Sequence, residues 1–334
     1  MADDARPGPF RMKMPPFLLY GVLLFCFGLC VYMFGTLLVF PRYLLGLRAW
    51  LDPVAHWLVW YSGMPVMLGL ALAMFDLLVM LQFKKPDVPV RYEPILRRRV
   101  TVALTAFNDE DSIASAIEDF REHPLVERVI VVSNNSTDRT VERAEAAGAI
   151  VFNEPMPGYG RCVFRCLSEA VRFEDTECVV LCEGDRTFRA YDIEKLFAYA
   201  PHADIVNGTR TVEPLRQYLT QLTTFMFYGN IFVGKLLEAK HLGRGTITDV
   251  GTTYKLCRRD AIIRLLPKLK PSVNLEFNAH FLDVALENEL VLLECPITFH
   301  PRVGVSKGGN VSNWRGLQVG LRMIAGLVGD WRHA

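Results

Sequence analysis

The chain has 334 residues, with 37 lysines and arginines against 36 aspartates and glutamates, and 51% of it is hydrophobic. A net charge of +1 argues against a nucleic-acid binder, which needs a clustered basic surface, and a charged fraction of 22% argues against disorder. Eight cysteines are too sparse for a disulfide scaffold, while the mean hydropathy of +0.20 predicts a membrane-embedded part.

The first predicted element is a membrane-spanning helix over residues 17–40, after a tail of residues 1–16. Its sequence, FLLYGVLLFCFGLCVYMFGTLLVF, carries no charge, and about 20 apolar residues suffice to cross the bilayer core. A cleaved signal peptide would have a shorter apolar centre and a small-residue cleavage site, which does not follow here. A second apolar stretch, residues 57–83, predicts a second span, with a buried helix of a soluble domain as the alternative.

Two residues interrupt the second stretch. Pro65 predicts a kink, because proline cannot donate a helical hydrogen bond. Asp76 is an ionisable residue among apolar ones, which makes it a functional candidate by default. We favour the other interpretation, a carboxylate paired with a cation at the membrane edge.

The distribution of basic residues predicts the orientation. Only Arg42 and Arg48 lie in the loop between the two stretches. Six basic residues follow the second stretch, Lys84, Lys85, Arg91, Arg97, Arg98 and Arg99, and three precede the first. The positive-inside rule then predicts a multi-pass protein of the cell (inner) membrane with both termini, and all of the chain after residue 83, in the cytosol. The later cysteines, spaced Cys162/Cys166 and Cys178/Cys182, are expected to be free buried thiols rather than zinc ligands.

After a proline-containing linker at residues 84–97, residues 98–313 are predicted to form the catalytic domain. Strand-like runs alternate with amphipathic helical segments: strands at 99–107, 126–134, 149–154 and 178–185, helices at 112–123, 137–148 and 162–171. This alternation predicts an α/β fold with a mainly parallel central sheet. Ligands of such sheets bind at the carboxyl ends of the strands.

Polar clusters lie at the carboxyl ends of three of these strands, at residues 108–110, 134–136 and 183–185, as expected of a nucleotide site. Neither a GxGxxG nor a GxxxxGK[ST] pattern occurs, so dinucleotide and P-loop sites lose support. The tripeptide Glu183-Gly184-Asp185 can hold a divalent cation, because Mg²⁺ or Mn²⁺ takes one or two carboxylates together with substrate phosphates. Its alternative interpretation is a solvated turn.

The motifs VALTAFNDEDSI, VVSNNSTDRT, LCEGDRTF, GTR, TDVGTTYK and ECPITFHPRVGVSKGG, in this order and spacing, resemble family 2 glycosyltransferases of the A-type fold. The last motif is similar to the ending of dolichol-phosphate mannose synthases and bacterial polyprenyl-phosphate glycosyltransferases. The resemblance implies a nucleotide-sugar-binding fold and a set of donor-binding residues: Thr105, Phe107, Asp109, Ser133, Asn134, Glu183, Asp185, Arg210, Arg302, Ser306 and Lys307.

The resemblance assigns roles within this set. Asp185 corresponds to the main metal ligand; Glu183 stands where the family has an aspartate, so it binds the metal directly, through water, or reaches the ribose instead. Ser133 and Asn134 replace two aspartates that often read the base, which leaves a UDP- or GDP-linked donor open. Arg302, with Ser306 and Lys307, corresponds to the contacts with the donor diphosphate and an acceptor phosphate.

The resulting hypothesis is a membrane-bound inverting glycosyltransferase that moves a sugar to a polyprenyl phosphate. A cation and Arg302 would stabilise the leaving diphosphate, and an anionic acceptor phosphate needs no strong base. If the acceptor is instead a lipid hydroxyl, as in ceramide or diacylglycerol, a carboxylate must take its proton, and Asp249 and Glu276 are the candidates. A non-catalytic membrane scaffold is the alternative from another class. A chain-elongating synthase is disfavoured, because two spans cannot build a pore alone.

Two further segments are predicted to lie in the membrane interface: residues 215–237, rich in Phe and Leu, and an amphipathic tail at 314–334. A core helix is the alternative for both. The expected partners are therefore a nucleotide-diphosphate sugar, a polyprenyl phosphate and a lipid bilayer, with no nucleic acid. The sequence leaves the sugar, the base and a homo-oligomer open.

Overall fold

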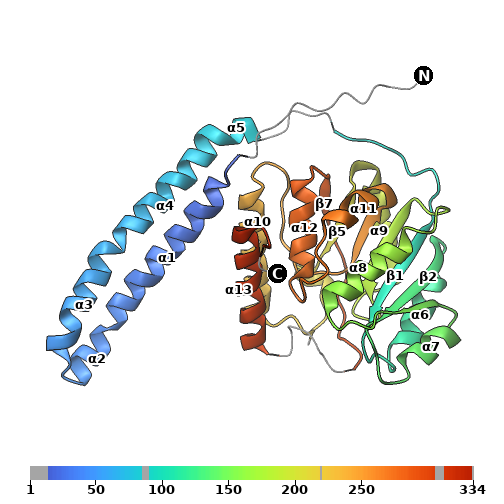
Figure 1. Cartoon of the computed structure of the whole chain (residues 1–334), viewed down its shortest axis with the longest axis horizontal. Helices are drawn as coiled ribbons and strands as arrows, with labels where there is room; N and C mark the ends of the chain where they lie inside the picture. Colours follow the sequence, from blue (N-terminus) through green and yellow to red (C-terminus); the bar gives the residue numbers. More distant parts are fainter. Residues whose placement is uncertain (1–13, 85–89, 219, 305–311, 333–334) are drawn as a thin grey trace. The chain divides into compact units, whose positions relative to one another are not determined.

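A computed structural model describes residues 14–84, 90–218, 220–304 and 312–332. It divides into two compact units, one ending at Pro86 and the other beginning at Asp87 (Figure 1). Two of the predicted donor contacts, Ser306 and Lys307, lie outside the described residues.

The first unit consists of two long apolar helical stretches, Phe17–Leu44 and Arg48–Lys84, which are long and apolar enough to cross a membrane. Their segments are α1 (Phe17–Leu37), α2 (Val39–Leu44), α3 (Arg48–Tyr61), α4 (Gly63–Phe75), a π-helical turn (Asp76–Met80) and α5 (Leu81–Lys84). The second stretch begins at Arg48 rather than at Trp57. Hydropathy alone misses this start, because the first turns carry Arg48 and Asp52, and Asp52 pairs with Arg42 of the preceding helix at 2.5 Å.

Proline and aspartate act in the second stretch largely as expected. The α-helix is interrupted at Ser62, next to Tyr61. Pro65 has no N–H and therefore cannot donate the helical hydrogen bond to the Tyr61 carbonyl. Asp76 is fully buried and lies 2.7 Å from the ammonium of Lys84, and its other oxygen accepts the backbone N–H of Leu18 at 2.7 Å. The prediction of a paired carboxylate is confirmed.

Helices α1 and α4 pack closely through glycine. A Cβ atom added at Gly21 would lie 2.7 Å from the carbonyl oxygen of Gly69, and one added at Gly69 would lie 2.6 Å from that of Gly21. At Gly28, the same addition would meet a Val66 methyl at 2.7 Å. Small residues at these positions let the two backbones approach, which is a common way for apolar helices to associate.

We expect Gly21→Leu to destabilise this helix pair by ~1–3 kcal/mol, because the first atom of the added side chain already meets backbone atoms of Gly69 and Ala73, which cannot move aside cheaply. Gly63→Leu is a matched control, because a Cβ atom at Gly63 meets nothing within 4 Å. The measurement is the midpoint of the thermal loss of helical circular dichroism in detergent. Equal midpoints for the two variants would contradict the packing described above.

The second unit is built on a seven-stranded sheet in the order β3-β2-β1-β4-β6-β5-β7. The strands are β1 (Val100–Ala106), β2 (Val126–Ser133), β3 (Ile150–Asn153), β4 (Cys178–Glu183), β5 (Ile205–Thr209), β6 (Lys255–Arg258) and β7 (Leu292–Pro296). Among the described strands, β6 alone runs antiparallel to its neighbours. The predicted α/β fold with a mainly parallel sheet is confirmed.

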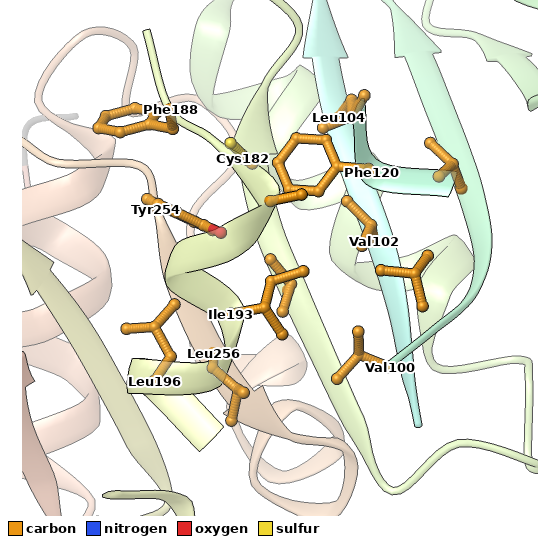
Figure 2. Close-up of a cluster of buried hydrophobic side chains, with 14 of the residues drawn as sticks. Val100, Val102, Leu104, Phe120, Cys182, Phe188, Ile193, Leu196, Tyr254 and Leu256 are labelled. Atoms are coloured by element: carbon orange, nitrogen blue, oxygen red, sulfur yellow. The ribbon is translucent and has the colours of Figure 1, made fainter. Parts of the chain in front are cut away.

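The helices of this unit cover the sheet. They are α6 (Ile113–Arg121), α7 (Thr140–Ala146), α8 (Tyr159–Ala170), α9 (Ile193–Tyr199), α10 (Thr224–Lys240), α11 (Arg259–Leu265), α12 (Phe277–Glu287) and α13 (Asn313–Gly329). Figure 2 shows the core on one face, where Val102 and Leu104 of β1 meet Phe120 of α6 and Ile193 of α9. Tyr254, at the entry to β6, is also buried there, and its hydroxyl donates to the Arg189 carbonyl at 2.9 Å.

Helices α10 and α13 lie side by side (Figure 1). Near their first turns, the Thr223 hydroxyl donates to the Asn313 side chain at 2.8 Å, and near their last turns Lys240 pairs with Asp330 at 2.9 Å. Lys240 also pairs with Asp283 of α12, so that all three helices are joined at this end.

The two predicted interfacial segments are the helices α10 and α13. The first of them begins at Thr224 rather than at Leu215, because Thr223 caps it by accepting the N–H of Met226. Each helix packs one face into the unit, as the core-helix alternative expected. Each also exposes large apolar side chains on another face: Phe225, Tyr228 and Phe232 of α10, and Trp314, Leu317, Leu321 and Val328 of α13.

Candidate functional site

The three predicted polar loops meet at one edge of the sheet. In the register of the parallel strands, Thr105 of β1 lies opposite Glu183 of β4, and Ala106 lies opposite Ser133 of β2. The first two loops are also tied together, because Asn108 accepts the N–H of Thr137 at 2.8 Å and adopts a left-handed backbone with φ of 52°. The prediction that the loops converge is therefore correct.

Arg302 also lies at this edge of the sheet, although it is far from the three loops in the sequence. Its guanidinium lies 2.8 Å from Asp109 and 3.2 Å from Asp185, and it thereby links the first loop to the loop after β4. The N–H of Val303 also donates to the Asp185 carbonyl at 3.1 Å. One cation thus balances two nearly buried carboxylates, in a position to meet an anionic ligand.

Glu183 and Asp185 are close enough to affect each other's charge. Burial, together with the neighbouring Asp185 carboxylate, raises the pKa of Glu183 from 4.5 to about 7. The Thr253 hydroxyl donates to Glu183 at 2.7 Å, and Thr253 is itself bonded to Tyr159 and Asn278. The side chain of Glu183 is therefore held in a defined position by groups from three other segments.

The two carboxylates are of the donor type that a divalent cation takes. In this structure one Asp185 oxygen accepts the N–H and the hydroxyl of Thr187, and the other pairs with Arg302, so a cation would displace some of these contacts. Two oxygen-donor side chains at a strand end are the set that Mg²⁺ or Mn²⁺ uses when substrate phosphates complete its coordination. No cluster of three or more His, Cys, Asp or Glu side chains suited to a metal occurs among the described residues. A cation here would consequently depend on the bound nucleotide for the rest of its ligands.

The raised pKa of Glu183 predicts a pH dependence of stability. A carboxyl group that binds its proton more tightly in the folded state makes the folded protein less stable as the pH rises from about 4.5 to about 7. In the presence of a chelator, we expect the free energy of unfolding of Glu183→Gln to fall over this pH range by at least ~1 kcal/mol less than that of the wild type. Thermal midpoints of both proteins across this pH range provide the test. Parallel curves would contradict the prediction.

The two residues predicted to read the base have their side chains engaged within the protein. Asn134 donates to the carbonyls of Met156 and Glu154 at 2.9 and 3.3 Å, and accepts the N–H of Gly158 at 2.9 Å. Ser133 is buried and donates to the Ser136 hydroxyl at 2.9 Å. A base bound here would meet an asparagine whose donors are already used, so these two residues shape the loop that surrounds it.

Asp249 and Arg210 form a buried ion pair. The guanidinium approaches the two carboxylate oxygens at 2.7 and 2.8 Å, and the Asn230 side chain donates to the same carboxylate at 2.7 Å. Burial opposes ionisation, but the Arg210 charge and hydrogen bonds outweigh it and lower the pKa of Asp249 to about 2. In this structure the carboxylate is engaged by both Arg210 and Asn230. Its role as a general base stays a prediction.

Glu276, the other residue predicted as a general base, lies at the start of α12. It precedes the first turn of α12, is 6% exposed, and accepts a hydrogen bond from Arg322 of α13 at 3.3 Å. It is not among the residues that line the cavity at the sheet edge. The structure therefore gives Glu276 a structural contact between α12 and α13.

A cavity of about 630 Å³ opens at this edge. At one end it is lined by seven of the predicted donor-binding residues, which are Thr105, Phe107, Asp109, Asn134, Glu183, Arg210 and Arg302. Asp185 and Ser133 are buried and do not contribute to the lining. From this end the cavity continues between α10 and α13, where the lining is mainly apolar: Leu222, Phe225, Met226, Phe232, Val233, Leu317, Val319, Leu321, Met323 and Ile324.

Sequence reasoning did not assign five polar residues of this cavity to the site: Tyr159, Asn230, Asn274, Asn278 and Arg315. Tyr159 follows the loop after β3, so its place at the carboxyl edge of the sheet could have been found from the strand pattern. Asn278 and Arg315 lie within amphipathic helices and carry no local signal. Only the packing of α12 and α13 brings them to the cavity wall.

Comparison with known proteins agrees with this geometry. Residues 101–266 match the model of glycosyl transferase family 2. Protein RfbJ of Shigella flexneri is 34% identical over 113 residues, which cover 33% of this chain and 84% of that protein. A dolichyl-phosphate hexose transferase of Haloferax volcanii is 26% identical over 209 residues, 62% of this chain and 86% of its own.

The same fold occurs in a solved structure. Glucosyl-3-phosphoglycerate synthase from Mycobacterium tuberculosis, in complex with Mn²⁺, UDP and phosphoglyceric acid, aligns with a TM-score of 0.53 at 18% identity, covering 70% of this chain and 79% of that one. Uncharacterised glycosyltransferases of mycobacteria are matched over only 48% of their length.

Proposed function

Because the chain belongs to glycosyltransferase family 2, we propose that it transfers a hexose from a nucleotide-diphosphate sugar to a polyprenyl phosphate. The observation that carries this proposal is the continuity of the cavity. Its polar end holds the carboxylates and guanidinium suited to a nucleotide diphosphate, and its other end is an apolar groove between α10 and α13. A donor and an isoprenoid acceptor would each find a matching surface in one cavity.

The apolar groove suits a lipid better than a soluble acceptor. A sugar or a small hydroxy acid would leave its hydroxyl groups unpaired against Phe, Leu, Val and Met side chains, which costs free energy. An isoprenoid chain buries apolar surface there, at about 25 cal/mol per Å². The similarity to a dolichyl-phosphate hexose transferase supports this choice of acceptor.

The reaction needs charge stabilisation more than proton transfer. Glu183 and Asp185 would hold Mg²⁺ or Mn²⁺, which supplies positive charge to the diphosphate when bound. Arg302 adds a guanidinium that stabilises charge on the same leaving group. An acceptor phosphate oxygen is already anionic and can attack the anomeric carbon directly, with inversion. This agrees with the engagement of Asp249 and Glu276 in contacts with Arg210 and Arg322.

The proposal includes a location. The two long apolar stretches would anchor the enzyme in the cell membrane, and the basic residues that follow them favour a cytosolic location for the second unit. Nucleotide sugars are then available to the site from the cytosolic side, and the lipid acceptor from the adjoining leaflet.

The test is to incubate the purified full chain, with Mn²⁺ or Mg²⁺, with UDP- and GDP-linked sugars and either a polyprenyl phosphate or the matching polyprenol, and to identify products by mass spectrometry. We expect a polyprenyl-phosphate hexose with one donor and none in chelator. Comparable turnover of the polyprenol would favour the lipid-hydroxyl alternative. Binding of the nucleotide without turnover of any acceptor would favour a scaffold.

A further inference from the structure

Three guanidinium groups line the cavity, and they differ in their partners. Arg210 is neutralised by Asp249, and Arg302 by Asp109 and Asp185. Arg315, in the first turn of α13, makes no ion pair with any described carboxylate, and its side chain is exposed. Among the described residues, it is therefore the cavity-lining arginine whose charge the protein itself does not balance.

The position of Arg315 along α13 relates it to the apolar groove. The residues of α13 that line the cavity begin at Arg315 and end at Ile324, a length of roughly 14 Å at 1.5 Å per residue. All of those after Arg315 are apolar or glycine. The first turn of α13 is also joined to the start of α10 through Asn313 and Thr223. One cation thus stands at the end of a groove whose remaining α13 wall carries no charge.

This arrangement matches an amphiphile with one anionic head and one long apolar chain. A guanidinium binds phosphate oxygens through two parallel hydrogen bonds, which gives affinity and orientation together. If the head lies at Arg315, the chain can follow the groove between the two helices. Arg210 and Arg302 are already paired, and Arg302 is assigned to the donor diphosphate, so a second anion in the cavity needs its own cation.

We propose that Arg315 binds the phosphate of the acceptor lipid and thereby determines that the acceptor is a phosphate rather than an alcohol. This inference rests on the proposed function, whose acceptor it specifies. It assigns the two substrates to different residues: the carboxylates and Arg302 hold the donor, while Arg315 and the groove hold the acceptor.

The experiment compares Arg315→Gln with Arg332→Gln in the full chain. Arg332 follows α13, is exposed, and lies outside the cavity lining, so its replacement changes the net charge equally. Farnesyl phosphate and farnesol are the probes, with affinities measured by calorimetry in detergent. UDP with Mn²⁺ is a third probe, which reports on the donor site and on folding.

We expect Arg315→Gln to weaken farnesyl phosphate binding about tenfold or more. Binding of farnesol and of UDP–Mn²⁺ should be unchanged. Arg315→Lys should restore part of the lost farnesyl phosphate affinity. In turnover, the KM for lipid phosphate should rise while the KM for the donor stays constant. Unchanged farnesyl phosphate binding, or an equal loss in Arg332→Gln, would overturn the proposal.

Failure of this inference differs from failure of the proposed function. If the wild-type chain glycosylates polyprenyl phosphate and Arg315→Gln does so with the same KM, the function stands and the assignment of Arg315 is wrong. If the wild-type chain transfers no sugar to polyprenyl phosphate but loses farnesyl phosphate affinity on Arg315→Gln, the phosphate site stands and the proposed reaction is wrong.

Discussion

Replacing Arg302 with glutamine is expected to lower kcat for sugar transfer by a factor of about 100 to 1,000, the range found when one preorganised donor to a developing anion is removed. The guanidinium lies between Asp109 and Asp185 and is itself 16% exposed, so it acts where water is largely excluded. Glutamine keeps a hydrogen-bond donor but loses the charge. The leaving diphosphate would then be stabilised less in the transition state than in the wild-type enzyme.

The assay is steady-state kinetics of the purified chain with a nucleotide sugar and the proposed acceptor, a lipid phosphate. Arg99→Gln serves as the control, because Arg99 is 55% exposed and pairs with Glu127 on the surface at 3.2 Å, where such pairs contribute little. If Arg302→Gln keeps kcat and raises only the KM for donor, Arg302 contributes uniform binding and not transition-state stabilisation.

The second large effect concerns folding. Asp249→Ala should lower the free energy of unfolding by about 3–5 kcal/mol, because it leaves the buried guanidinium of Arg210 without a counter-charge. Asn230 and the N–H of Gly251 lose their acceptor in the same step. Thermal midpoints in detergent provide the measurement.

A double mutant identifies the cause. Arg210→Met combined with Asp249→Leu should be less destabilised than the sum of the two single variants, because neither charge is then left alone. The variant Asp249→Asn distinguishes a catalytic base from a structural ion pair. If Asp249→Asn folded with wild-type stability but lost turnover, the buried-pair interpretation would be wrong.

The parts of this fold that the sequence predicts are the local ones. The first four strands and the helices between them follow from apolar runs and helical periodicity, and their polar ends follow from the rule that parallel strands present their carboxyl ends together. Because adjacent parallel strands stay in register, the convergence of Thr105, Ser133 and Glu183 could be stated before the structure was known.

The remaining features depend on contacts between distant residues. Thr253 holds Glu183 across 70 positions, and Asn207 of β5 bonds the Asp249 carbonyl across 42. Nothing near Asp249 distinguishes a carboxylate paired with Arg210 from one free to act as a base. The short strand β6 carries no pattern that predicts its antiparallel direction, and the groove exists only because α10 and α13 pack beside each other.

The ion pair between Arg302 and Asp109 spans 193 positions of the chain, and this affects when the site can form during synthesis. At 5–20 residues per second, a ribosome needs ~10–40 s to add Arg302 after Asp109. Once Asp185 has been added, the first strands can already pair, while the carboxylates of Asp109 and Asp185 still lack the cation that both of them contact in the folded protein. All seven described strands precede Arg302 in the chain, so the sheet can form before the cation that joins Asp109 to Asp185 has been synthesised.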